Sequence, residues 1–229
     1  MHWFFDPSLS NSSSSLAADE AKHARSLRLQ VGEKITVTNG RGLVVSATMN
    51  SEVTYAIEKL EEQPAPRRRF HLVQALAKSD RDEMALQAAC ELGLATVTPW
   101  AADRSIVRWD GKEARNADRW QQIALSAMKQ SQQPWLTEVM PLAKTKQLSP
   151  LGLGLVLDPR AEATLADVDL SSSDVMLVVG PEGGISESEL ADLRLRGFKP
   201  VRLGPSVLRT STAGPAALAA LQFASGYWS

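Results

Sequence analysis

The chain has 229 residues, of which 44% are hydrophobic and 22% are charged, with 14 glycines and 12 prolines. These proportions are typical of a globular protein with one large domain or two small ones, and they exclude collagen-like, coiled-coil and disordered chains. The 25 lysines and arginines are balanced by 26 acidic residues. The overall charge therefore does not indicate a nucleic-acid partner, and a polyanion would have to bind a local basic patch.

Several further features indicate a cytoplasmic protein without a membrane segment. No apolar run approaches the roughly 20 residues of a membrane-spanning helix, and the N-terminal sequence lacks the basic leader of a secretory signal. Cys90 is the only cysteine, so no internal disulfide can form, which fits a reducing compartment. The three histidines lie far from Cys90 and from one another, which is not the spacing of a zinc site, and we predict no metal.

The first part of the chain has the pattern of short β-strands. Residues 34–38 alternate polar and apolar side chains, and Asn39-Gly40-Arg41-Gly42 then predicts a hairpin turn into a strand at 43–49. Residues 53–57 alternate again, and residues 19–29 have the pattern of a helix. Short strands separated by glycine turns predict a small β-barrel over residues 1–66.

A linker follows, because the two prolines in residues 63–69 can continue neither a strand ladder nor a helix interior. We interpret the three arginines at its end as a solvated stretch, although they are also suited to contact phosphate. From residue 70 onward strands and helices alternate, which predicts a second domain of the α/β class over residues 70–229.

The elements of this second domain are predicted from their apolar periodicity. Capping boxes at Asp80 with Glu83, and at Ser186 with Glu189, mark two helix starts. Strands are predicted at 70–77, 95–99, 153–157, 175–179 and 200–203, and helices at 80–93, around Trp120, at 186–197 and at 213–224. The nearly all-apolar strands are typical of a parallel sheet that is buried on both faces.

A glycine-rich loop follows the strand at 175–179. The sequence Gly180-Pro181-Glu182-Gly183-Gly184 lies between that strand and a capped helix, at the edge where open α/β sheets bind ligands. Glycines allow a ligand to approach the backbone closely, so a valine at position 183 is expected to abolish binding. The carboxylate of Glu182 favours a neutral or cationic ligand over a polyphosphate, and S-adenosylmethionine carries a cationic sulfonium.

A second glycine turn, at residues 203–213, again joins a strand to a helix. Arg209 stands just before that helix. A guanidinium at such a junction is suited to bind phosphate or to stabilise a developing oxyanion, and a surface ion pair remains the alternative.

The succession of GPEGG, SxxE and LGxxVLRT resembles the RsmE family of 16S rRNA (uridine-N3) methyltransferases, within the SPOUT superfamily. The resemblance extends over the whole chain. Residues 22–32 resemble the family's H…VLR…G element, residues 78–83 and 91–93 the start of its catalytic domain, and residues 119–131 its RW..I…A..Q segment.

This resemblance implies a fold and a set of partners. Members have an RNA-binding PUA-like β-barrel joined to an α/β SPOUT domain whose C-terminal part forms a deep trefoil knot, a rare exception to the rule against knotted chains. They are cytoplasmic homodimers that bind S-adenosylmethionine at the knot. They methylate N3 of a uridine in 16S rRNA of the small ribosomal subunit.

The resemblance also implies roles for individual residues. Arg209 is the candidate catalytic residue, through stabilisation of the uracil anion. The cofactor-binding candidates are Leu157, Gly180, Pro181, Glu182, Gly183, Gly184, Leu203, Gly204, Val207, Leu208 and Thr210. The RNA-binding candidates are Arg25, Arg28, Lys78, Arg81 and Arg104. No general base stands out from the sequence: Glu182 is the nearest acid by motif, and solvent or an RNA group are the alternatives.

The chain departs from the family pattern at three positions. Ser211 replaces an acid, Ala88 stands where lysine is common, and Gln133 where arginine is common. Two other functions therefore stay open at this point. One is a SPOUT methyltransferase that acts on another RNA, such as tRNA. The other is a non-catalytic RNA-binding factor in ribosome assembly, which would bind the cofactor without transferring its methyl group.

Overall fold

A computed structural model describes residues 1–227, and these residues form two compact units. Unit 1 contains Met1–Pro66 together with Met128–Leu136, and unit 2 contains Arg67–Ala127 and the residues from Thr137 onward. The sequence had predicted one boundary, after residue 66, and no return of the chain. The difference has a physical cause: the amide of Gly42 donates to the carbonyl of Pro134 at 3.0 Å, a pairing that no local pattern reveals.

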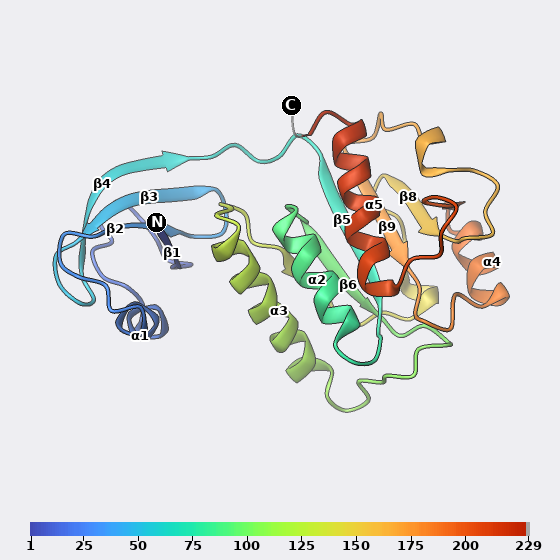
Figure 1. Cartoon of the computed structure of the whole chain (residues 1–229), viewed down its shortest axis with the longest axis horizontal. Coiled ribbons are helices and arrows are strands. Elements are labelled where there is room, and N and C mark those ends of the chain that lie inside the picture. The colour runs from blue at the N-terminus through green and yellow to red at the C-terminus, as the bar shows by residue number, and fades with distance from the viewer. Residues whose placement is uncertain (228–229) are drawn as a thin grey trace. The chain divides into compact units, whose positions relative to one another are not determined.

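Unit 1 is built on a four-stranded sheet (Figure 1). Its strands pair in the order β1 (His2–Phe5), β2 (Lys34–Thr38), β3 (Leu43–Met49) and β4 (Tyr55–Glu62), and α1 spans Ala18–Ser26. β1 pairs in parallel with β2, and the other neighbours are antiparallel. β1 was not predicted from the sequence, and its Phe4 is fully buried in the core of this unit.

The hairpin between β2 and β3 is confirmed at its glycines. Gly40 and Gly42 have φ of 67° and 95°, the left-handed region that favours glycine. A Cβ atom on Gly42 would also lie 2.6 Å from the ring of Trp135, so the turn needs glycine for space as well as for conformation.

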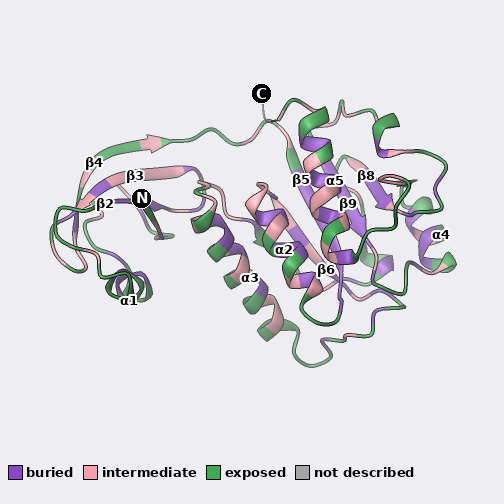
Figure 2. Ribbon diagram, in the orientation of Figure 1, coloured by how far each residue is buried: buried purple, intermediate pink, exposed green. Residues whose placement is uncertain are grey.

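Unit 2 contains a six-stranded sheet in which every pairing is parallel, which confirms the predicted α/β class. The order is β10-β8-β9-β5-β6-β7. The strands are β5 (Arg69–Ala75), β6 (Thr96–Trp100), β7 (Glu138–Val139), β8 (Leu153–Leu157), β9 (Asp174–Val179) and β10 (Phe198–Val201). Most residues of the central strands β8, β9 and β5 are buried (Figure 2).

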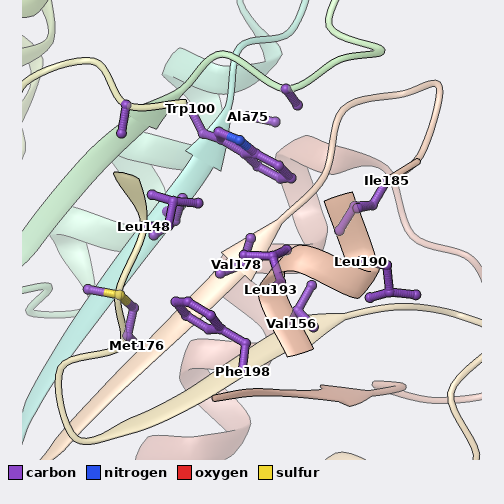
Figure 3. Close-up of a cluster of buried hydrophobic side chains, with 13 residues drawn as sticks. Ala75, Trp100, Leu148, Val156, Met176, Val178, Ile185, Leu190, Leu193 and Phe198 are labelled. Carbon is purple, nitrogen blue, oxygen red and sulfur yellow. The ribbon is translucent and has the colours of Figure 1, made fainter. Parts of the chain in front are cut away.

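Helices cover both faces of this sheet, because successive side chains of a strand point to opposite sides. The helices are α2 (Arg81–Glu91), α3 (Glu113–Gln130), α4 (Glu187–Leu195) and α5 (Thr210–Ala224), with short 3₁₀ turns at Thr145–Gln147 and Leu165–Asp167. Leu72 faces Leu218 of α5. Its neighbour Val73 faces the other way, in a cluster with Leu190 and Leu193 of α4 (Figure 3).

The two predicted capping boxes lie at the starts of α2 and α4, and only one of them forms. The box at Ser186 is confirmed, since its hydroxyl accepts from the amide of Glu189 at 3.2 Å. The box at Asp80 is wrong: Asp80 has φ of 57° and its side chain caps nothing. Instead the buried carboxylate of Asp82 accepts from the amide of Ala77 at 3.0 Å and fixes the turn before α2.

The boundaries near the C-terminus also shift. β10 begins and ends about two residues before the predicted strand at 200–203. α5 begins at Thr210 rather than at 213, so it starts immediately after Arg209. Within residues 1–227, no helix combines the length and apolar character needed to cross a membrane.

Candidate active site

A cavity of about 590 Å³ lies in unit 2 at the carboxyl ends of β8, β9 and β10. This volume is within the usual range of roughly 300–1,000 Å³ for small-molecule and cofactor sites. The lining residues are Arg81, Arg104, Leu157, Asp158, Pro159, Arg160, Val179, Gly180, Pro181, Glu182, Gly184, Ile185, Leu203, Gly204, Ser206, Val207, Leu208, Arg209, Thr210 and Ala213. The two glycine-containing segments singled out in the sequence therefore line the same cavity.

Two polar side chains and one backbone carbonyl join these segments. The hydroxyl of Thr210 donates to the carbonyl of Gly180 at 2.8 Å. The side-chain amide of Gln74, at the end of β5, donates to the hydroxyl of Thr210 at 2.9 Å. Gln74 is fully buried, so these bonds are shielded from water and are costly to break.

The loop after β9 is shaped by its glycines. The amide of Gly184 donates to the carbonyl of Pro181 at 2.9 Å, and Gly184 has φ of 73°. A Cβ atom on Gly180 would lie 2.7 Å from the side chain of Ile185, so a larger residue would not fit there. In contrast, no heavy atom outside residues 203–205 lies within 4 Å of the Cβ position of Gly204, which leaves space beside the backbone of the second segment.

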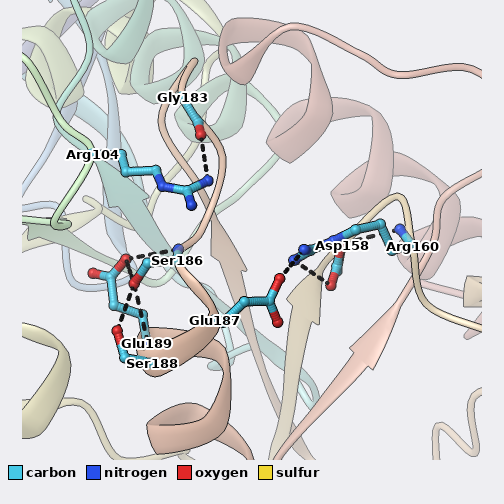
Figure 4. A network of polar contacts seen from close by, with 8 residues as sticks. All are labelled: Arg104, Asp158, Arg160, Gly183, Ser186, Glu187, Ser188 and Glu189. Carbon is cyan, nitrogen blue, oxygen red and sulfur yellow. Dashed lines mark hydrogen bonds and ion pairs between the residues drawn. The ribbon is translucent and has the colours of Figure 1, made fainter.

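A polar network holds this loop in place (Figure 4). Arg104 donates from Nη1 to the carbonyl of Gly183 at 3.1 Å. Glu189 is buried, and its Oε1 accepts from the amide of Asp103 and from the hydroxyl of Thr145, both at 2.9 Å. The start of α4 and the segment around Asp103 are thus fastened to each other beside the cavity.

An acid at the end of β8 is held by an arginine (Figure 4). Arg160 donates from Nε to Oδ1 of Asp158 at 2.9 Å and from Nη2 to Oδ2 at 3.2 Å, and it also bonds Glu187. Burial opposes ionisation of Asp158, but the hydrogen bonds and the positive charge of Arg160 outweigh it and lower the pKa of the carboxyl. Asp158 is therefore a carboxylate with both oxygens bonded.

The cavity contains a second acid, Glu182, and an arginine without a partner. Arg81 Nη1 lies 3.2 Å from Glu182 Oε1, and both side chains are about three-quarters shielded. The guanidinium of Arg209 makes no hydrogen bond or ion pair with any residue in 1–227, although it lines the same cavity. It is thus available to a ligand.

The structure places most of the predicted site residues together. Arg209 and all the predicted cofactor-binding residues except Gly183 line the cavity. Gly183 instead packs against Arg104: a Cβ atom added to Gly183 would lie 3.1 Å from the Cβ of Arg104. A side chain at position 183 would therefore first meet Arg104, a contact that the sequence did not reveal.

The predicted RNA-binding residues are divided between the units. Arg81 and Arg104 line the cavity, and Lys78 is exposed in the turn before α2. Arg25 and Arg28 are exposed in unit 1, at and just after the end of α1.

Sequence reasoning missed three residues of the site. Asp158 and Arg160 directly follow a buried strand, a position from which they could have been inferred. Gln74 gave no signal, because its partner Thr210 is 136 positions away in the chain.

Comparison with known proteins assigns this fold. Residues 63–222 match a family model described as an RNA methyltransferase domain, and residues 16–52 match an RNA methyltransferase PUA domain. The ribosomal RNA small subunit methyltransferase E of Mycobacterium tuberculosis (strain CDC 1551 / Oshkosh) is 35% identical over 225 residues, which cover 92% of this chain and 86% of the relative. That of Aquifex aeolicus is 30% identical over 221 residues, which cover 93% and 95%.

Two solved structures have the same overall fold. The ribosomal RNA small subunit methyltransferase E of Neisseria gonorrhoeae, bound to S-adenosylmethionine, is 28% identical, with a TM-score of 0.89 over 98% of both chains. A putative methyltransferase of Legionella pneumophila, also in complex with S-adenosylmethionine, is 30% identical, with the same TM-score and coverage. The resemblance seen in the sequence is thereby confirmed, and the chain belongs to the family of the ribosomal RNA small subunit methyltransferases E.

Proposed function

We propose that this protein is an enzyme that transfers a methyl group from S-adenosylmethionine to N3 of a uridine in 16S rRNA of the small ribosomal subunit. The observation that carries the proposal is the meeting of residues 180–184 and 203–210 around one cavity at the carboxyl ends of β8, β9 and β10. Relatives named for small-subunit RNA methylation, and relatives bound to S-adenosylmethionine, support the same conclusion.

The cavity has the properties that this cofactor requires. Its volume is sufficient for a cofactor. Val207, which lines the cavity, is 77% exposed, so a bound ligand would cover an apolar side chain. The open space at Gly204 lets a ligand approach the backbone. When bound, S-adenosylmethionine supplies a methyl group on a positively charged sulfur.

We assign the binding of the cofactor to the residues that the two segments and the end of β8 contribute. They are Leu157, Gly180, Pro181, Glu182, Gly183, Gly184, Leu203, Gly204, Val207, Leu208 and Thr210. For most of them the backbone would make the contact. For Gly183 the contribution is to hold the loop through Arg104.

Arg209 would act on the target base. Uracil N3 attacks well only after it loses its proton, and the resulting anion spreads charge onto the two flanking carbonyl oxygens. The unpartnered guanidinium of Arg209 would stabilise that charge from within the cavity. A preorganised donor of this kind typically contributes roughly 3 kcal/mol to the stability of a transition state.

RNA would be held by basic side chains in each unit. We assign phosphate contacts to Arg25 and Arg28 in unit 1, and to Lys78, Arg81 and Arg104 in unit 2. Because N3 lies on the Watson–Crick edge, the target base must be splayed out of its stack before it can react. Binding should weaken as the salt concentration rises.

Two finer features of the fold are part of the proposal. The sheet of unit 1 would curl into a PUA-like barrel around the core that contains Phe4, Ile35 and Tyr55. The C-terminal segment would form a trefoil knot. The topology supports it, because the chain leaves β10 at one edge of the sheet and returns to pack α5 on the central strands β5 and β9.

We further propose that the enzyme is a cytoplasmic homodimer. α5 has no charged residue, and Phe223 on it is 77% exposed, so the helix presents an apolar surface suited to a second copy of the chain. The cytoplasm is where the proposed substrate, the small ribosomal subunit, is assembled.

Methyl transfer to purified small subunits and to bare 16S rRNA tests this function. We expect labelled methyl groups from S-adenosylmethionine to appear in 16S rRNA, at N3 of one uridine when the modified base is mapped by mass spectrometry. Methylation of tRNA alone would contradict the proposal, as would binding of the cofactor without any transfer.

A further inference from the structure

The reaction proposed above needs a group that takes the proton from N3 of the uridine. This requirement rests on the proposed function, since N3 of uracil carries hydrogen at neutral pH and cannot attack a methyl group until the hydrogen leaves. A positioned side chain that accepts the proton typically contributes 100- to 10,000-fold in rate, as an order-of-magnitude estimate.

Within residues 1–227, the cavity lining offers two side chains that accept a proton at neutral pH. They are Asp158 and Glu182, because the other ionisable lining residues are arginines. Arg160 binds both oxygens of Asp158, and the pKa of Asp158 is lowered, so Asp158 is a poor base. Glu182, in contrast, has only one oxygen bonded to an arginine.

Glu182 keeps one oxygen available. Its Oε1 is 3.2 Å from Arg81, whereas its Oε2 bonds to no residue in 1–227. The side chain is 22% exposed, so it is accessible from the cavity without being fully solvated. It also shares the cavity with Arg209, the candidate for stabilising the uracil anion.

We propose that Glu182 is the proton acceptor of the reaction and that Arg81 is its positioning residue. The proton on N3 passes to the free carboxylate oxygen of Glu182, and the electron pair left on N3 forms the bond to the methyl carbon. The bond from that carbon to sulfur breaks with its electron pair on sulfur, which becomes a neutral thioether. Glu182 then returns the proton to solvent.

The turn before α2 is built to hold Arg81 toward Glu182. Ser79 and Asp80 are non-glycine residues with φ of 59° and 57°, a left-handed conformation that is unfavourable for serine and that aspartate adopts only occasionally. The hydrogen bond from the amide of Ala77 to the buried Asp82 holds this turn. Strain maintained beside a cavity is a common feature of functional sites.

Glu182→Gln tests the proposal, because it keeps the size of the side chain and removes its basicity. We expect kcat on small subunits at pH 7 to fall about 100-fold or more, with a cofactor Kd, measured by calorimetry, within about threefold of the unaltered protein. The variant should regain activity as the pH rises, by about tenfold per pH unit, because solvent then removes the proton from N3.

A change in the substrate gives an independent readout. Fluorine at C5 of uracil withdraws electrons and lowers the pKa of N3–H. Small subunits reconstituted with 16S rRNA that contains 5-fluorouridine should therefore restore much of the activity of the Glu182→Gln variant and change that of the unaltered enzyme far less.

Glu83→Gln is the matched control, since Glu83 also pairs with an arginine, Arg119, at 2.7 Å, is 20% exposed and lies outside the cavity lining. It should keep normal activity at every pH. Arg81→Lys should retain more activity than Arg81→Met, because lysine can still donate to the carboxylate of Glu182 and methionine cannot.

Several outcomes would overturn the proposal. They are an unchanged kcat in Glu182→Gln, a loss explained by weaker cofactor binding, and a loss that is equal at every pH and on both substrates. If the unaltered enzyme methylates N3 and the variant is fully active, this inference alone fails. If the unaltered enzyme methylates another atom, the proposed function fails and this inference fails with it.

Discussion

The hydroxyl of Thr210 bonds to the carbonyl of Gly180 across 30 positions of the chain. This contact connects the first residue of α5 with the residue that follows β9, and both line the cavity. Because Gln74 donates to the same hydroxyl from a fully buried position, Thr210 has little freedom to turn. A ligand that rests on both segments meets a surface arranged in advance, which lowers the cost of binding.

Thr210→Val should weaken both folding and ligand binding. Valine has nearly the same shape but lacks the hydroxyl that donates to the carbonyl of Gly180 and accepts from the side-chain amide of Gln74. We expect the free energy of unfolding to fall by about 1–3 kcal/mol and the Kd of S-adenosylmethionine to rise about tenfold. Urea denaturation and calorimetry measure the two effects. Thr210→Ser keeps the hydroxyl and should stay close to the unaltered protein, and equal effects of both variants would refute the role of the hydrogen bond.

Arg209→Ala should reduce turnover and leave the cofactor in place. The guanidinium has no polar partner within residues 1–227, so its removal breaks no hydrogen bond or ion pair there. We expect kcat to fall about 100-fold, the loss typical for one preorganised donor, with an unchanged melting temperature and cofactor Kd. Filter-binding assays of labelled methyl transfer to small subunits provide the measurement. Undiminished turnover would remove Arg209 from the reaction, and Arg209→Lys should show an intermediate rate.

Gly183→Val should displace the loop after β9. A Cβ atom there would lie 3.1 Å from the Cβ of Arg104 and 3.3 Å from its carbonyl oxygen, and the methyl groups of valine would collide further. We expect the cofactor Kd to rise more than tenfold, by calorimetry, because the loop must move. Gly183→Ala requires a shift of only a few tenths of an ångström and should be mild. An unchanged Kd for the valine variant would show that this loop does not bind the cofactor.

Asp174→Asn should lower stability in a pH-dependent way. Burial acts to raise the pKa of Asp174, but hydrogen bonds from His71, at 3.1 Å, and from Arg69, at 2.8 Å, lower it to about 2. A carboxyl whose pKa falls on folding stabilises the protein above its ordinary pKa of about 4, and this contribution disappears as the pH falls toward 2.

The variant should therefore be less stable by about 1–2 kcal/mol at pH 7, a range that allows for the solvent exposure of Arg69. Urea denaturation between pH 7 and pH 2.5 should show this difference shrinking below about pH 4. A difference that stays constant over this range would refute the assignment. Asp174 lies at the opposite ends of the strands from the cavity, so kcat should not change.

Local patterns were sufficient for much of unit 2. The buried strands, the capping box at Ser186 and the glycine-rich loop after β9 depend on neighbours within a few residues, so the sequence displays them directly. At Asp80 the predicted capping box does not form. The sequence has the residues of a capping box, but the buried carboxylate of Asp82 takes over the turn and forces Asp80 into a left-handed conformation. A tertiary contact there outweighs a local preference.

The sequence by itself determined the α/β class, the parallel sheet and the residues from which the cavity would be drawn, because apolar periodicity and glycine placement act over short distances. Only the tertiary structure decided that Gln74 fastens Thr210, that Arg81 reaches Glu182 across 101 positions, and that residues 128–136 return to unit 1. These contacts join segments far apart in the chain. Their geometry exists only after the strands have paired, so no local pattern can encode it.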